Sequence, residues 1–241
     1  MIFQTGIENG SEGRSIAWAL EHPGCFAYGK NGAAAALNLE SSLLKYAGWI
    51  LHHDTQSWLK FSESEIDIVI NGTWEVYYID DNDNKVSEVE NGYSVDSFFP
   101  YDWKPLNAIE IKHGLDMLLW SRDDLLASIK GLSQEKMNAT YPGERWSING
   151  VLGHVGGAEW WYLSRLGLAS PREQVPEEPV QRLNKVRQNL NAALGKLEGV
   201  KQVIGIDGEF WSPRKILRRA LWHERDHTEH ILKLKEMKSG L

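Results

Sequence analysis

The chain has 241 residues, 42% of them hydrophobic and 24% charged, which is the composition of an ordinary globular protein. Its net charge of −7 is uneven: residues 1–104 carry 6 basic and 16 acidic side chains, so we expect no nucleic-acid ligand. One cysteine excludes an intramolecular disulfide, and we find neither a signal peptide nor an apolar run long enough to cross a membrane. We therefore expect a soluble cytoplasmic protein that has no membrane contact.

The first half of the chain predicts an α+β domain. Alternating and β-branched residues bounded by turn signals favour strands, and a run with a broad apolar face favours a helix. The predicted elements are strands at 3–7, 15–20 and 25–28, a helix at 32–53, strands at 66–70 and 73–79, and a turn at 80–84. We place this domain at residues 1–98.

Two neighbouring stretches in this half carry a family resemblance. They are SIAWALEHPGCFAYG (15–29) and the helical AAAALNLESSLLKY (33–46). Over residues 1–80, the chain resembles the HicB-like antitoxin fold. The resemblance implies a sheet with one long helix and an interaction module of the antitoxin type, although no DNA-binding segment follows it.

The second half predicts four amphipathic helices. Aromatic residues and two prolines at 99–105 mark a linker, and helical periodicity follows at 107–129, 148–167, 180–197 and 213–238. Ser147 and Ser212 are N-cap residues, Pro213 stands at a first helical position, and 170–179 is a proline-rich loop. Four helices of similar length predict an all-α four-helix bundle over residues 106–241.

Three histidines predict a metal site inside this bundle. His223 and His227 lie one helical turn apart on the apolar face of the last helix, and His154 lies on the apolar second helix. Glycines at 153, 156 and 157 indicate room beside His154. Buried imidazoles need a hydrogen-bond partner or a metal, and three of them form a ligand set with an open position. Zinc, nickel, iron or manganese could occupy the site, and the ligand set alone does not choose among them; we expect zinc or nickel, with iron or manganese as alternatives.

Residues 223–227 also spell the H-E-x-x-H pattern of zinc proteases. No third metal ligand follows at the spacing that zinc proteases require, so we disfavour a protease. Glu224 is a candidate catalytic base, with a surface or ligand-supporting role as the alternative. His230 lies too far along the helix to share the metal, and we expect it to be exposed or to support the ligands.

Two other features have plainer interpretations. Cys25 is expected to be a small core residue, because no basic neighbour indicates a lowered thiol pKa. The basic cluster (residues 214, 215, 218 and 219) is expected to be a solvated face rather than a phosphate site.

The stretches WSINGVLGHVGGAEWWYLSRL (146–166) and WSPRKILRRALWHERDHTEHI (211–231) resemble the DinB/YfiT-like superfamily over residues 105–241. The resemblance implies a four-helix bundle whose metal is held by His154, His223 and His227. Characterised members include metal-dependent transferases that use low-molecular-weight thiols such as bacillithiol or mycothiol, and a thiol-dependent isomerase. Gly150 and Gly153 stand where the family pattern has larger residues, which indicates a wider pocket.

These observations lead to two functional hypotheses. The first is a metal-dependent enzyme, a thiol S-transferase or related transferase with a low-molecular-weight thiol as co-substrate and a small-molecule acceptor. The second is a non-catalytic metal-binding or regulatory protein whose antitoxin-like N-terminal module mediates association. In either case a homodimer is a possible assembly.

Overall fold

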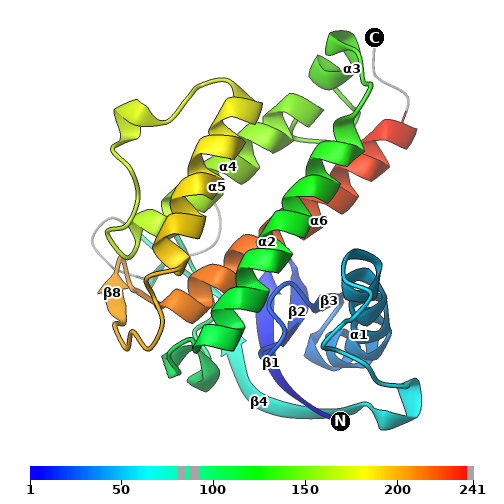
Figure 1. The fold of residues 1–241 in the computed structure, drawn as a ribbon, viewed down its shortest axis with the longest axis vertical. Helices are drawn as coiled ribbons and strands as arrows, with labels where there is room; N and C mark the ends of the chain where they lie inside the picture. The colour runs from blue at the N-terminus through cyan, green and yellow to red at the C-terminus, as the bar shows by residue number, and fades with distance from the viewer. Residues whose placement is uncertain (81–84, 87–92, 238–241) are drawn as a thin grey trace. The chain divides into compact units, whose positions relative to one another are not determined.

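The computed structural model describes residues 1–80, 85–86 and 93–237 (Figure 1). By their contacts these residues divide into two compact units. The first unit contains 1–105 and 201–218, and the second contains 106–200 and 219 onward. The chain passes from the first unit to the second after residue 105, returns to the first at residue 201 and leaves it again after residue 218. The expected domains at 1–98 and 106–241, with a linker at 99–105, stay a prediction.

The first unit is built around a four-stranded sheet. Its strands are β1 (Ile2–Ser11), β2 (Arg14–Ala19), β3 (Phe26–Gly29) and β4 (Asp67–Glu75). They lie in the order β3-β2-β1-β4. Strand β2 is antiparallel to both β1 and β3, whereas β4 runs parallel to β1, with Phe3 opposite Ile68. The two strands predicted at 66–70 and 73–79 are therefore replaced by the long β4 and the short β5 (Tyr77–Ile79).

Helix α1 (Gly32–His53) begins and ends at the predicted residues and packs on this sheet. The Asn31 side chain caps it by accepting a hydrogen bond from the Ala34 amide at 2.9 Å. Gly29 permits the close approach of β3, because a Cβ there would lie 2.2 Å from the Ala35 nitrogen. The buried stripe consists of Ala35, Leu39, Leu43, Tyr46 and Ile50. Leu37 and Leu51, expected on this face, are exposed.

Smaller sheets complete the first unit. Strands β6 (Lys85–Val86), β5 and β7 (Tyr93–Val95) form a three-stranded sheet in that order. Strands β8 (Ile204–Ile206) and β9 (Glu209–Trp211) form a hairpin, which corrects the expectation that everything after the linker is helical. Its turn residues Asp207 and Gly208 both have positive φ, +51° and +70°. The predicted turn at 80–84 falls almost entirely outside the described residues.

The second unit is helical. It contains α2 (Ala108–Ile129), the short α3 (Gln134–Asn138), α4 (Ile148–Ser164), α5 (Pro179–Leu194) and most of α6 (Pro213–Glu236). Asn107 and Ser147 cap α2 and α4. One hydrophobic cluster draws residues from every one of these helices, including Leu125, Val155, Leu183 and Ile231. Helices α4 and α5 lie side by side (Figure 1).

Among the described residues, none of the helices combines the length and the apolar character that crossing a bilayer requires.

Candidate metal centre

The three predicted histidines meet in the second unit. His154 projects from the middle of α4, and His223 and His227 project from successive turns of α6. One ring nitrogen from each lies within 4.8 Å of the others. The Nε2 atoms of His154 and His223 are 3.0 Å apart, and the ring centroids of His223 and His227 are 4.4 Å apart. We call these three residues the histidine triad.

Burial keeps two of these imidazoles neutral. Desolvation, followed by the neighbouring His227 and His154 and by Arg219, lowers the pKa of His223 well below its ordinary value. Desolvation, followed by His154 and His230, lowers the pKa of His227 to about 3. A neutral imidazole has a lone pair available for a metal, so at pH 7 both side chains are in the ligand form without losing a proton.

An aromatic wall borders the triad. The Trp146 ring stacks on the His154 ring, with centroids 4.3 Å apart and planes at 23°, and meets His227 edge-on at 6.2 Å. The Arg145 guanidinium lies 4.7 Å from the Trp146 ring centroid. The buried Tyr162 ring meets His223 edge-on at 6.1 Å. Trp146 directly precedes Ser147, the cap of α4, and His154 lies two turns further along the same helix, so one short segment supplies both stacked rings.

The glycines near His154 are explained by packing more than by an open pocket. A Cβ at Gly156 would lie 3.0 Å from Cγ of Arg182 on α5, so this glycine permits the close contact of α4 and α5. A Cβ at Gly150 would lie 3.0 Å from the Trp146 Cβ. Only Gly157 has nothing within 4 Å of the added atom. The expectation that these glycines leave room for a ligand therefore applies to Gly157 at most.

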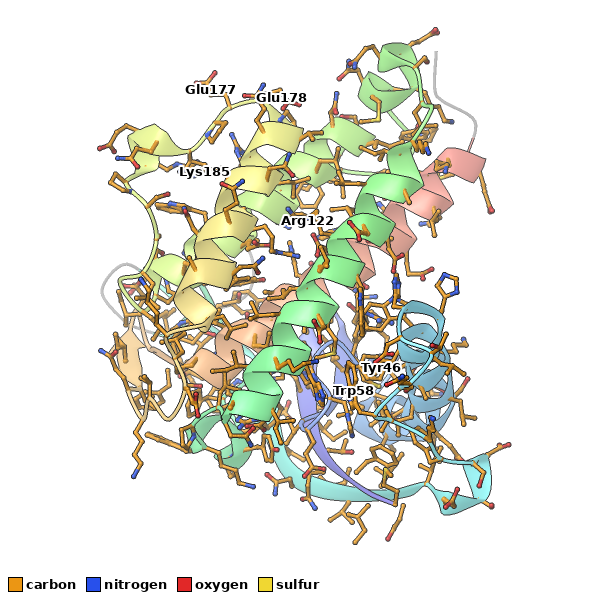
Figure 2. All side chains as sticks on the ribbon, viewed as in Figure 1. Tyr46, Trp58, Arg122, Glu177, Glu178 and Lys185 are labelled. Atoms are coloured by element: carbon orange, nitrogen blue, oxygen red, sulfur yellow. The ribbon has the colours of Figure 1, made fainter. Side chains whose placement is uncertain are left out.

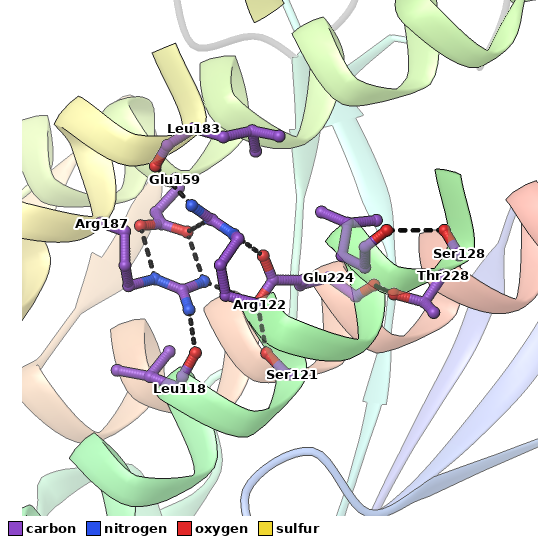
Figure 3. A network of polar contacts seen from close by, with 10 residues as sticks. Leu118, Ser121, Arg122, Ser128, Glu159, Leu183, Arg187, Glu224 and Thr228 are labelled. Atoms are coloured by element: carbon purple, nitrogen blue, oxygen red, sulfur yellow. Dashed lines mark hydrogen bonds and ion pairs between the residues drawn. The ribbon is translucent and has the colours of Figure 1, made fainter. Parts of the chain in front are cut away.

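Glu224 is fully buried, which excludes the surface role given as one alternative for it. Its Oε1 accepts from Nε of Arg122 at 2.5 Å, and its Oε2 accepts from Nη2 of Arg187 at 2.7 Å and from the Ser121 hydroxyl (Figure 3). Although desolvation opposes ionisation, the two arginines and Ser121 lower the pKa of this carboxyl. Its role as catalytic base stays a prediction, and a carboxylate held in this way is a poor proton acceptor.

His230, one turn beyond His227, holds a neighbouring loop. Its Nε2 lies 2.9 Å from Oε2 of Glu144, and Lys233 donates to Oε1 of Glu144 at 2.8 Å. The hydrogen bond from Lys233, assisted by His230, lowers the pKa of Glu144. Because Glu144 stands two residues before Trp146, these bonds fix the loop that carries the aromatic wall. The expectation that His230 supports the ligands fits this position.

The basic cluster is not a solvated face, and that prediction is wrong. Residues 214, 215, 218 and 219 are all at least 93% buried. In the first unit, Lys215 pairs with Glu209 at 2.5 Å, and Arg218 pairs with Asp102 at 2.7 Å. Arg214 donates to the carbonyls of residues 104 and 105. Asp102 and the two carbonyls lie 109–116 residues away in the sequence, so the local pattern did not reveal them, whereas Glu209 precedes Lys215 by only six residues. Cys25 is a buried free cysteine, as expected.

Sequence reasoning missed the buried charges around Glu224. Arg187 donates to Glu224, and Glu159 accepts from the same two arginines, but neither Arg187 nor Glu159 was singled out. A signal was available: Glu159 follows Val155 by four residues, and Arg187 follows Leu183 by four, so both occupy core-facing positions. Charged residues of opposite sign at such positions indicate pairing inside the core.

Comparison with known proteins supports the assignment of this region. A family model described as the DinB superfamily matches residues 117–231. This stretch is a DinB superfamily domain. It contains the whole histidine triad, which could hold a metal ion. No curated protein and no solved structure matches the chain significantly. The match does not extend over the N-terminal region, for which the HicB-like resemblance stays a prediction.

The residues of the DinB superfamily domain fit a metal ion. Imidazole nitrogens bound to zinc at 2.0–2.1 Å lie about 3.3 Å apart in tetrahedral geometry, close to the 3.0 Å between His154 and His223. Nδ1 of His227 is buried without a hydrogen-bond partner. Two buried neutral imidazoles and a third within reach form a donor set suited to a divalent transition metal.

Proposed function

We propose that the DinB superfamily domain is a four-helix bundle whose metal centre is formed by His154, His223 and His227. The observation that carries the proposal is the convergence of three imidazole nitrogens within 4.8 Å from two separate helices. Helix α4 supplies one ligand and α6 supplies two, and the aromatic wall shields one side. Three protein ligands leave a further coordination position for a small molecule, which is typical of catalytic rather than structural sites.

The chemistry that best fits this centre is a thiol S-transfer or a related transfer reaction. A divalent ion bound by three neutral ligands supplies Lewis acidity, which favours the thiolate form of a thiol at neutral pH. The protein itself contributes neutral ligands, a partly apolar wall and the fixed loop at Glu144. A low-molecular-weight thiol is the expected co-substrate, with zinc or nickel as the metal and iron or manganese as alternatives.

The alternative is a metal-binding protein with a regulatory or structural role. The locked Glu224 carboxylate favours it, because the nearest acidic residue in sequence to the triad pairs with arginines instead of the imidazoles. For the N-terminal region we propose the HicB-like fold. The element order of three strands, a helix and a fourth strand supports that fold.

Metal analysis tests the proposed centre. Wild-type protein, His223→Ala and His113→Ala are purified in parallel and measured by inductively coupled plasma mass spectrometry. His113 lies on α2 outside the triad and serves as the matched control. We expect one metal per chain in the wild type and in His113→Ala, and loss in His223→Ala. Normal metal content in His223→Ala would reject the site.

Catalysis is tested separately with the metal-loaded wild type. A panel of low-molecular-weight thiols is incubated with small electrophiles, and conjugates are detected by mass spectrometry. Conjugation by the wild type that His223→Ala lacks supports the transferase. A fully loaded protein that conjugates none of the panel would favour the regulatory alternative.

A further inference from the structure

Four charged side chains form a buried cluster in the second unit, one from each long helix. The charge cluster consists of Arg122 on α2, Glu159 on α4, Arg187 on α5 and Glu224 on α6 (Figure 3). Their side chains are 6%, 3%, 7% and 1% exposed, respectively. Figure 2 shows Arg122 between α2 and α5. The two positive and two negative charges balance.

Each arginine of the charge cluster bridges both carboxylates. Arg122 donates from Nε to Glu224 and from Nη2 to Glu159, at 2.5 and 3.1 Å. Arg187 donates from Nη2 to Glu224 at 2.7 Å and from Nε to Glu159 at 2.9 Å. Nη1 of each arginine donates to a main-chain carbonyl, that of Leu183 on α5 for Arg122 and that of Leu118 on α2 for Arg187. The guanidinium groups are thus tied to all four helices.

Stability alone does not explain this arrangement. Removing four charges from water costs several kcal/mol per ion, and well-packed apolar residues of similar size are often as stable or more stable. Planar guanidinium groups that bind carboxylates and carbonyls through several fixed donors define angles and distances, which apolar contacts do not. The charge cluster therefore contributes more to the relative placement of the helices than to the free energy of folding.

The carboxylates of the charge cluster lie on the two helices that carry the triad. Glu224 directly follows His223 and precedes His227 by three residues, and Glu159 follows His154 by five residues on α4. A rotation or axial shift of α6 that moves Glu224 also moves both of its histidines, since all three share one rigid helix. Helices α2 and α5, which supply the arginines, carry none of the triad histidines.

We propose that Arg122 and Arg187 are positioning residues for the metal centre. By joining Glu159 to Glu224 they fix the rotation and the axial register of α6 against α4, and so hold the three imidazole nitrogens around one point. This inference rests on the proposed function, because it assumes that the triad binds a metal.

Cobalt binding by the full-length chain tests the inference. Each protein is stripped of metal and titrated with Co²⁺ in competition with a chelator, and its visible absorption is recorded. The conservative variants are Glu224→Gln, which keeps the shape and removes the charge, and Arg187→Lys, which keeps the charge and removes the planar fork. Asp116→Asn, in a more exposed ion pair with Lys112 on α2, is the control.

We expect the two conservative variants to bind Co²⁺ 10- to 100-fold more weakly than wild type, with an altered absorption band, as for other groups that orient metal ligands. Asp116→Asn should match wild type. A fourth variant replaces Arg122 and Arg187 by Met and Glu159 and Glu224 by Leu, which leaves no unpaired charge. It should unfold cooperatively near the wild-type temperature, yet also show weakened binding and a changed spectrum.

Two results would overturn the inference, and they are distinguishable. Wild-type affinity and spectrum in folded Glu224→Gln and Arg187→Lys would overturn the positioning role alone and leave the metal centre intact. Failure of the wild-type chain itself to bind Co²⁺ would overturn the proposed function together with this inference.

Discussion

The acid sensitivity of the first unit should depend on His22. This side chain packs against the rings of Phe3 and Tyr46, with centroids at 5.4 and 6.2 Å, and burial lowers its pKa to about 4. In the unfolded chain the ordinary value is about 6.5, so below that pH the unfolded state binds a proton that the folded state does not. Stability is therefore full above pH 6.5 and falls as the pH drops toward 4. From pH 7 to 5 the loss is at most about 2 kcal/mol from this residue.

Urea unfolding of metal-free protein at several pH values measures this loss. His22→Gln keeps a polar side chain of similar length but does not titrate, so its free energy of unfolding should fall less steeply between pH 7 and 5 than that of the wild type. His52→Gln is the control, because His52 is an exposed residue near the end of α1. The difference in slope is the quantity of interest, since the absolute stability of the variant also includes lost packing. Equal slopes for wild type and His22→Gln would refute the reasoning.

Three further predictions concern packing and buried charge. Trp146→Ala should destabilise the metal-free protein by about 1–3 kcal/mol in chemical denaturation, because the stack on His154 is lost, and Trp146→Phe should recover part of it. Gly157→Ala should stabilise α4 by up to about 1 kcal/mol, because alanine favours a helix over glycine. Gly156→Ala should stabilise the protein less or destabilise it, because the added methyl group would press on α5. Equal shifts of the unfolding temperature for the two variants would contradict this prediction. Lys215→Met should cost about 3–5 kcal/mol by leaving Glu209 buried without its partner, and the added change Glu209→Gln should restore much of the stability measured in urea.

The sequence predicted the elements whose patterns are local. Helix α1 was predicted at its observed bounds, and the start of α4 followed from Ser147 as a capping residue. The triad could be predicted for the same reason. His223 and His227 share one helical face, and a lone histidine on another apolar helix needed a partner. Periodicity places side chains on faces, and faces of amphipathic helices meet in the core.

The missed features depend on contacts between distant residues. The basic residues of the first turns of α6 look like a solvated face until Asp102, 116 residues away, is placed beside Arg218. Glu209, six residues before Lys215, was a nearby signal that was missed. The β8–β9 hairpin had a readable signal in Asp207-Gly208 between alternating apolar residues, but the surrounding helical pattern obscured it. The role of Glu224 was left open between a base, a surface residue and support of the ligands, because the pattern of its own helix does not show the arginines that α2 and α5 bring to it.

The first unit is discontinuous in the chain, with residues 201–218 returning to it after the whole of α5. A truncation that starts at residue 106 would therefore keep Arg218 but remove its counter-charge Asp102, at one end of the helix that bears His223. Lys215 would keep its ion-pair partner Glu209 but lose the carbonyl of Asp96. No single cut in the chain separates the two units, because the first unit consists of two segments. Expression of the histidine-bearing portion therefore needs either the whole 241-residue chain or a compensating replacement at Arg218.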